Sequence, residues 1–279
     1  MTTPDSSCLQ LPPNLAVIAS EKLGETSDEI RSNALESLRQ KILELSELDR
    51  IQDVSDKNLI RFLRSRKFDI DKALKQTIEY RHFFSKYAEE LKDIKKEEFN
   101  KFEQLSQFLT VLKEGTINEH VVIIMHPKAA ISLFTKEFVR ENPNLMLRFN
   151  IWLFEKLSFD LQVQVNGLVI INTFSKLTMW DQMAMSGMAP MSHQTDTFKF
   201  FQILGFRFGG AYIFEQPFIF NIIWALARPF MSEKIRSRFN LCGSDYTKLA
   251  NVVTDVSQLP TFLGGTVENY ESSWIQEQE

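Results

Sequence analysis

The sequence predicts an α/β protein in which a helical N-terminal domain precedes a domain built on a mainly parallel β-sheet. Apolar residues recur with helical spacing as far as about residue 107. Short apolar segments then alternate with helical ones as far as about residue 267, a pattern typical of parallel strands joined by crossover helices. With 279 residues, 44% of them hydrophobic, the chain can bury one large core or two modest ones.

We expect a flexible leader over residues 1–25, because several prolines there oppose regular structure. The helical domain is expected over residues 26–107, and either Thr26 or Ser27 can cap its first helix. The apolar face of that helix consists of Ile30, Ala34, Leu38, Ile42 and Leu45.

Two further helices are predicted in the same domain. The first contains Leu59 to Leu63, and the second begins after the capping residue Asp69 and runs to about Tyr87. A turn around residues 66–68 separates them.

The α/β domain is expected over residues 108–267, followed by an acidic tail over residues 268–279. Its predicted strands are Phe108–Leu112, Val121–Met125, Leu168–Ile171, Ala211–Phe214 and Phe239–Leu241. The predicted helices cover about 135–160, with a break at Asn142-Pro143, and then 178–186, 191–204 and the segment after Pro217.

The segment after Pro217 is the most informative part of the chain. It is apolar on nearly all sides, and Lys234, Arg236 and Arg238 follow it closely. Its unbroken apolar part is about ten residues, too short to span a bilayer. This pattern predicts a flap that covers an apolar cavity and touches an anionic membrane; the alternative is a buried core helix followed by a solvated basic turn.

Charge and motif content exclude several classes of function. The net charge of −4 argues against a nucleic-acid binder, although residues 57–75 and 228–238 form two local basic patches. The four histidines are scattered, no metal-binding or phosphate-loop motif is present, and Ser186 lacks the glycine pattern of a nucleophile elbow. We therefore expect no catalytic residues and no metal site. The opening residues lack a secretory signal, so a cytoplasmic location is the default.

Four motifs in register resemble the CRAL-TRIO family. They are LIRFLRSRKFDIDKA (59–73), NGLVIINTF (166–174), the stretch from Tyr212 through EQPFIFNIIWALARPFMSEKIRSRF, and LPTFLGG (259–265). Within the family the chain is most similar to the branch of tocopherol transfer and cellular retinaldehyde-binding proteins, rather than to yeast phosphatidylinositol transfer proteins. The resemblance implies a helical N-terminal domain and an α/β domain whose sheet floors a hydrophobic cavity closed by a gate helix.

The resemblance also implies the residues that line the cavity. They are Leu147, Asn150, Ile151, Phe154, Leu168, Ile170, Asn172, Met179, Met183, Phe200, Leu204, Phe206, Phe220, Ile223, Trp224 and Ala227. Asn150, Phe154 and Asn172 depart from the tocopherol-binding pattern, so ligand specificity does not carry over. Buried asparagines need hydrogen-bond partners, which a ligand hydroxyl, carbonyl or ester or an ordered water can supply.

A phosphoinositide site is implied by the same comparison. Its residues are Arg66, Lys75, Arg207, Lys234 and Arg238. Several convergent cations suit a polyphosphate, since charge-assisted hydrogen bonds to phosphate are strong. The alternative is a solvated basic surface.

The resulting hypothesis is a monomeric, non-enzymatic carrier without a cofactor, which binds one hydrophobic ligand and transfers it to or from phosphoinositide-bearing membranes. Retinal or retinol, tocopherol and carotenoid are the leading ligands. The protein would be cytoplasmic, with transient peripheral membrane association. A lipid-sensing regulatory module that acts through a protein partner is the alternative, and an unrecognised hydrolase is disfavoured.

Overall fold

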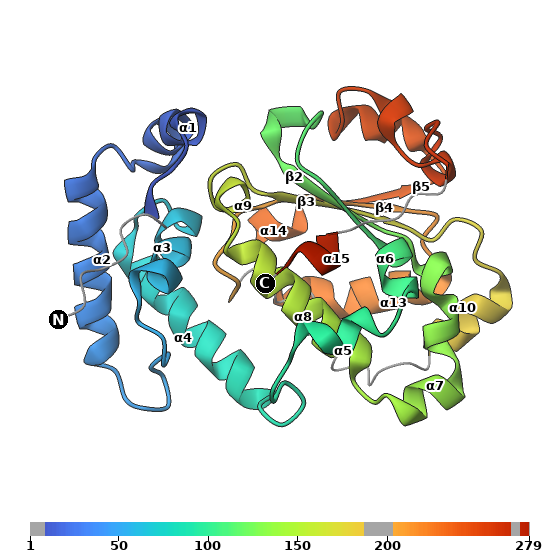
Figure 1. Ribbon diagram of the computed structural model, residues 1–279, viewed down its shortest axis with the longest axis horizontal. Coiled ribbons are helices and arrows are strands. Elements are labelled where there is room, and N and C mark those ends of the chain that lie inside the picture. The colour runs from blue at the N-terminus through green and yellow to red at the C-terminus, as the bar shows by residue number, and fades with distance from the viewer. Residues whose placement is uncertain (1–8, 187–202, 269–273, 279) are drawn as a thin grey trace. The chain divides into compact units, whose positions relative to one another are not determined.

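The computed structural model describes residues 9–186, 203–268 and 274–278 (Figure 1). Its contacts divide these residues into two compact units. The helical unit comprises residues 9–92, 153–167 and 203–207, and the sheet unit comprises residues 93–152, 168–186, 208–268 and 274–278. The predicted fold class, a helical N-terminal region followed by a mostly parallel sheet with helices, is confirmed.

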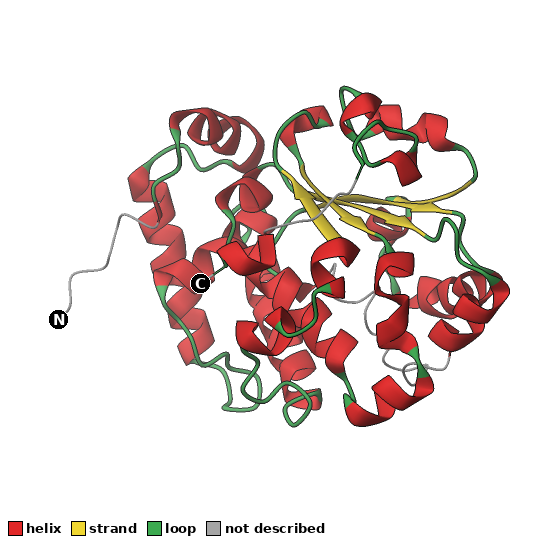
Figure 2. Cartoon of the chain, turned by 45° about the vertical axis from the view of Figure 1, so that its right-hand side comes forward, coloured by secondary structure: helices red, strands yellow, loops and turns green. Residues whose placement is uncertain are grey.

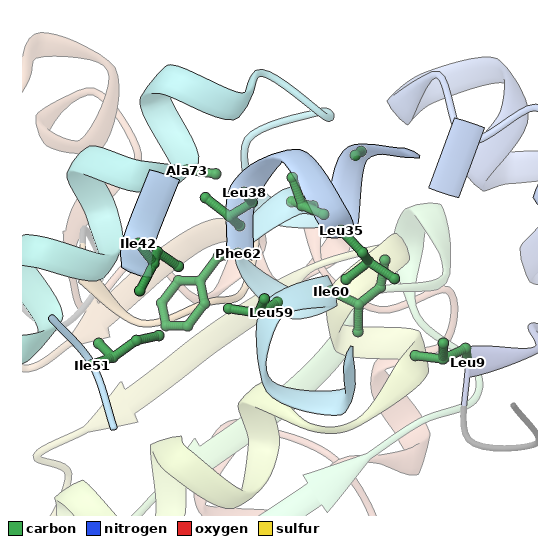
Figure 3. Close-up of a cluster of buried hydrophobic side chains, with 11 residues drawn as sticks. Leu9, Leu35, Leu38, Ile42, Ile51, Leu59, Ile60, Phe62 and Ala73 are labelled. Carbon is green, nitrogen blue, oxygen red and sulfur yellow. The ribbon is translucent and has the colours of Figure 1, made fainter. Parts of the chain in front are cut away.

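Three helices with capped N-termini form most of the helical unit: α2 (Asp28–Leu43), α3 (Asp56–Ser65) and α4 (Ile70–Lys86). The hydroxyl of Ser27 accepts from the backbone N–H of Ile30 at 3.2 Å, and the carboxylate of Asp69 accepts from that of Lys72 at 3.0 Å. The two predicted caps are therefore confirmed. Figure 3 shows the apolar core that these helices share, which includes Leu38, Ile42, Leu59 and Phe62.

Two expectations for this unit were wrong. The leader is not irregular throughout, because Pro13 begins helix α1 (Pro13–Leu23). A proline is compatible with the first turn of a helix, where its missing N–H has no intrahelical acceptor. Leu15, Ala19 and Leu23 are buried with Val165 of α9 (Leu161–Val165). In α2, Ile30 lies in the first turn and is 42% exposed, and Leu35 joins the buried face instead.

A five-stranded sheet organises the second unit, in the order β1-β2-β3-β4-β5. Its strands are β1 (Leu109–Leu112), β2 (Val121–Met125), β3 (Leu168–Thr173), β4 (Phe208–Phe214) and β5 (Phe239–Gly243). The first two strands are antiparallel, and β2 to β5 are parallel. Figure 2 shows helices on both sides of the sheet.

The two faces of the sheet are covered by different segments. Val169 and Ile171 of β3 pack against Leu249, Leu259 and other residues of the segment that contains η5 (Tyr246–Asn251), η6 (Val256–Gln258) and η7 (Thr261–Leu263). Because side chains alternate along a strand, Leu168, Ile170 and Asn172 point to the opposite face. Figure 1 shows α13 (Phe218–Ala227) on that side of the sheet and η5 to η7 on the other.

The remaining elements of the sheet unit connect the strands or pack at their ends. They are α5 (Lys96–Asn100), α6 (Gln104–Phe108), η2 (Ile117–Glu119), η3 (Pro127–Phe134), α7 (Lys136–Glu141), α10 (Met179–Ser186), η4 (Arg228–Phe230), α14 (Glu233–Arg236) and α15 (Trp274–Glu277). Helix α8 (Leu145–Ser158) contributes residues to both units, and the predicted break at Asn142-Pro143 separates it from α7. The helix predicted over 191–204 lies outside the described residues except at its last two positions.

The predicted acidic tail is partly a packed element. Trp274 and Ile275 of α15 are 8% and 2% exposed, and the ring of Trp274 lies 5.9 Å from that of Trp152. The ammonium group of Lys96 also donates to the backbone carbonyl of Gln276 at 3.4 Å. Two apolar side chains and Lys96 thus hold the described residues 274–278 of a segment whose composition is acidic.

Candidate lipid-binding site

Helix α13 has two apolar faces that differ in burial. Phe218, Ile222, Leu226 and Phe230 of the following turn repeat every four residues and are 77%, 38%, 48% and 71% exposed. The other face carries Phe220, Ile223 and Trp224, which are partly buried, and Ala227, which is 2% exposed. A core helix would bury all of these large side chains, so the exposed stripe needs a separate explanation.

The inner face of α13 packs on the sheet. The ring centroid of Phe220 lies 5.7 Å from that of Phe174, which directly follows β3. At the other end of the helix, Trp224 lies 4.8 Å from Phe239 of β5, which in turn lies 5.4 Å from Phe208 of β4. Helix α13 therefore covers the sheet face to which Leu168, Ile170 and Asn172 belong.

Two asparagines of the sheet unit stand out among the predicted cavity residues. Leu168 and Ile170 are buried, whereas the Oδ1 atoms of Asn150 and Asn172 are buried without a hydrogen-bond partner among the described residues. A buried carbonyl oxygen without a donor costs about 1–3 kcal/mol, so such groups are uncommon in folded proteins. These two oxygens are candidate contacts for a bound molecule or ordered water.

The other predicted cavity residues divide between the two units. In the sheet unit, Leu147 is partly buried and Ile151 is 2% exposed. In the helical unit, Phe154 and Phe206 are buried and stacked with ring centroids 6.2 Å apart, and Leu204 is 1% exposed. Phe200 lies outside the described residues.

Two residues that were expected to line the cavity are exposed. Met179 and Met183 of α10 are 76% and 59% exposed, as is Trp180 between them at 78%. On another side of α10, the carboxylate of Asp181 accepts from the ammonium group of Lys128 at 2.7 Å. Neither methionine is a buried wall residue, and their contact with a ligand stays a prediction.

The five predicted phosphoinositide residues also divide between the units. In the helical unit, the Nε of Arg66 donates to the Oε1 of Gln76 at 2.9 Å. The Nη1 of Arg207 donates to the backbone carbonyl of Val165, and Lys75 is exposed on α4. In the sheet unit, Lys234 is exposed on α14, and an Nη1 of Arg238 donates to the carbonyl of Phe208. Burial lowers the pKa of Arg66 and of Arg238, which marks both guanidinium groups as partly desolvated cations.

The basic stretch over residues 57–75 is not a continuous surface patch. Arg61 and Arg64 are 1% and 0% exposed. Arg64 binds the carboxylate of Glu25 through two hydrogen bonds of 2.8 Å, and Arg61 lies 3.0 Å from that of Glu155. Both cations therefore hold the helical unit together, and only the remaining basic residues of the stretch are available to a ligand.

Exposed side chains on α10 and η4 were missed by the sequence reasoning. Trp180 and Phe230 extend the apolar surface beyond the residues that were singled out. The spacing of Phe230, twelve residues after Phe218, was a detectable signal. No comparable spacing marks Trp180, whose exposed fraction is known only from the structure.

Within the described ranges, no group of three or more His, Cys, Asp or Glu side chains is arranged to hold a metal ion. Over the same residues, no helix combines the length and apolar composition needed to cross a membrane.

Comparison with known proteins identifies the family. Residues 105–265 match the model of the CRAL/TRIO domain, and residues 21–79 match that of the CRAL/TRIO N-terminal domain. The alpha-tocopherol transfer protein-like protein of Homo sapiens is 31% identical over 225 residues, covering 79% of this chain and 61% of that protein. Clavesin-2 of Homo sapiens is 24% identical over 224 residues, covering 79% of this chain and 65% of its own length.

The matched region thus spans less than two thirds of the length of these relatives. Among solved structures, the crystal structure of Sfh5 aligns with a TM-score of 0.51 and 16% identity, covering 90% of this chain and 96% of that chain. At this identity the likeness shows the fold alone. The resemblance found in the sequence motifs is confirmed by the two domain matches, and the chain belongs to the CRAL/TRIO family of lipid-binding proteins.

Proposed function

We propose that this protein is a non-enzymatic carrier, which holds one apolar molecule between α13 and the sheet and exchanges it with a phosphoinositide-bearing membrane. The observation that carries the proposal is the unequal burial of the two apolar faces of α13. A helix that closes over a ligand in water and contacts lipid at a membrane needs apolar side chains on both faces. Burial of the ligand contributes about 25 cal/mol per Å² of apolar surface.

The asparagines narrow the class of ligand. An Oδ1 atom accepts hydrogen bonds but cannot donate them, so Asn150 and Asn172 favour a ligand with a hydroxyl group or an ordered water. An aldehyde or an ester offers no donor. Of the candidate ligands, retinol and a tocopherol-like prenol supply a hydroxyl, whereas retinal and a hydrocarbon carotenoid do not.

The protein would act as a monomer in the cytoplasm and would bind membranes transiently. Cations for phosphoinositide headgroups would come from Arg66, Lys75 and Arg207 in the helical unit and from Lys234 and Arg238 in the sheet unit. Each Lys or Arg near an anionic bilayer contributes about 1 kcal/mol to membrane binding. A regulatory module acting through a protein partner has less support, because the packed residues of α15 leave less of the acidic tail available for docking.

Filling the space over β3 tests the ligand site. Ile170→Trp adds bulk to the sheet face under α13, so we expect the folded variant to lose uptake of retinol or tocopherol, measured by fluorescence titration. Ile170→Val, which removes one methyl group without filling space, is the matched control and should retain uptake. Undiminished uptake by a folded Ile170→Trp protein would place the ligand elsewhere.

Removing two cations tests the membrane step. Arg207→Ala combined with Arg238→Ala should slow ligand transfer to phosphoinositide vesicles while ligand affinity stays nearly unchanged. Added salt should act in the same direction on the wild type, because the screening length is about 8 Å at physiological ionic strength. Lys113→Ala combined with Lys248→Ala removes the same charge elsewhere and should transfer normally. If both double variants transferred ligand equally fast, the proposed phosphoinositide site would be only a solvated basic surface.

A further inference from the structure

We propose that Gln76 is a positioning residue, which fixes the cations of the helical unit in the orientation that binds a phosphorylated headgroup. The inference rests on the proposed function, because Arg66, Lys75 and Arg207 are assigned there to that headgroup. Gln76 lies on α4, directly after Lys75, and only 2% of it is exposed. A buried amide with no direct access to the ligand can act only through its neighbours.

All polar atoms of the Gln76 side chain are engaged. Its Oε1 accepts from the Nε of Arg66 at 2.9 Å and from the hydroxyl of Ser65 at 2.7 Å. Its Nε2 donates to the backbone carbonyl of Leu204 at 2.8 Å. One side chain therefore joins the C-terminus of α3, the helix α4 and the segment 203–207.

That segment carries Arg207 and is held closely against α3. A Cβ atom added at Gly205 would lie 2.6 Å from the Cγ of Arg61 and 3.2 Å from its backbone carbonyl carbon, so only glycine fits there. Three residues after Leu204, an Nη1 of Arg207 donates to the carbonyl of Val165. The hydrogen bond from Gln76 to Leu204 thus anchors the backbone that leads to Arg207.

The chemistry of an amide explains why glutamine suits this position. Holding the Nε of Arg66 directs the rest of the guanidinium group and removes rotamer freedom that would otherwise be lost on binding. A neutral amide orients the guanidinium group and adds no counter-charge of its own to that of nearby Glu79. A glutamate would pair with Arg66 and would lack the donor for Leu204.

The test measures binding to phosphatidylcholine vesicles that contain phosphatidylinositol bisphosphate. Gln76→Met keeps the length of the side chain and removes its hydrogen bonds, and we expect about tenfold weaker binding, corresponding to about 1.4 kcal/mol. Vesicles with phosphatidylserine at equal charge should show a smaller change. Competition by soluble inositol trisphosphate, which carries the two ring phosphates and the phosphate at the position of the diester, separates recognition of the headgroup from a requirement for the bilayer. Ser65→Ala removes one bond to Gln76 without touching Arg66 or Leu204, and this control should bind nearly as the wild type does.

A double variant separates positioning from loss of stability. If Gln76 acts through Arg66, then Gln76→Met should weaken binding much less in an Arg66→Ala background than in the wild type. Additive losses would overturn the positioning role. Should Gln76→Met fail to fold, Arg66→Lys tests the same contact: we expect it to bind as weakly as Arg66→Ala, and wild-type binding would show that charge alone matters. If Arg66→Ala and Arg207→Ala themselves bind normally, the proposed headgroup site fails and the positioning role of Gln76 falls with it. Weak binding by Arg66→Ala together with normal binding by Gln76→Met would overturn the role of Gln76 alone.

Discussion

Buried charged residues account for much of the difference between the sequence and the structure at the scale of single residues. Arg61 and Arg64 lie three positions apart on a helix whose residues 58 to 64 are all buried. The ring of Phe159 lies 4.5 Å from the guanidinium carbon of Arg61, and Glu25 accepts from both Arg64 and Arg31. Their charges suggested a surface, because the carboxylates that pair with them are distant in the sequence. Loss of one partner of such a pair costs about 3–5 kcal/mol.

His126 is a second residue whose environment the sequence could not predict. It follows β2, and its ring stacks on that of Phe262 with centroids 3.9 Å apart. Burial, together with the nearby charges of Lys176 and Lys128, lowers the pKa of His126 from 6.5 to about 4. The neutral ring is therefore the form that the folded protein accommodates.

This shift predicts a loss of stability in acid. Between about pH 6.5 and pH 4 the unfolded chain binds a proton at His126 that the folded chain does not, so the free energy of unfolding falls as the pH falls. We expect a contribution of about 1–2 kcal/mol, allowing for partial solvent access. Urea unfolding of the wild type and of His126→Phe, which keeps the ring stack, measures this contribution. The difference between the free energies of unfolding of the two proteins should change from pH 7 to pH 4.5. A constant difference would contradict the assignment.

At the scale of single elements, local patterns predicted the helices and strands well. Ser27 and Asp69 cap helices as their types and positions indicate, and the break at Asn142-Pro143 separates α7 from α8. The division of α13 into two faces also follows from spacing, with Phe218 and Ile222 on one side and Trp224 on the other. Placement of α1 and α15 was missed, because a few apolar residues in polar or proline-rich segments carry little periodicity.

The faces of α13 give opposite predictions for two substitutions. Phe218→Asp places a carboxylate on the exposed stripe, so release of ligand to vesicles should fall strongly while occupancy in solution is retained, because a carboxylate is penalised on entering lipid. Trp224 faces the sheet, so Trp224→Asp should abolish ligand occupancy in solution. Asn221→Asp adds the same charge at an exposed position without removing an apolar group, and it provides the control for charge alone. If both Phe218→Asp and Trp224→Asp merely unfold the protein to a similar extent, α13 is a static core helix.

At the scale of the whole molecule, segments that are distant in the sequence pack together. Such long-range packing is the feature that a single sequence predicts least. Alternating strands and helices predicted a parallel sheet, yet α9 and residues 203–207 pack with the N-terminal helices. The predicted lining residues and cations are consequently distributed over both units, with Phe154 and Arg207 in one and Ile170 and Arg238 in the other. Long-range pairs such as Gln76 and Leu204 set this arrangement, and no local pattern encodes them.

The most direct test of the central claim is to identify what the purified protein carries. The chain would be expressed in a eukaryotic host, extracted with organic solvent and examined by mass spectrometry, with Ile170→Trp prepared in parallel. We predict one non-covalent apolar molecule per chain, bearing a hydroxyl group, in the wild type and none in the folded variant. A wild-type protein that remains empty after exposure to retinol, tocopherol and membrane lipid extracts would contradict the account.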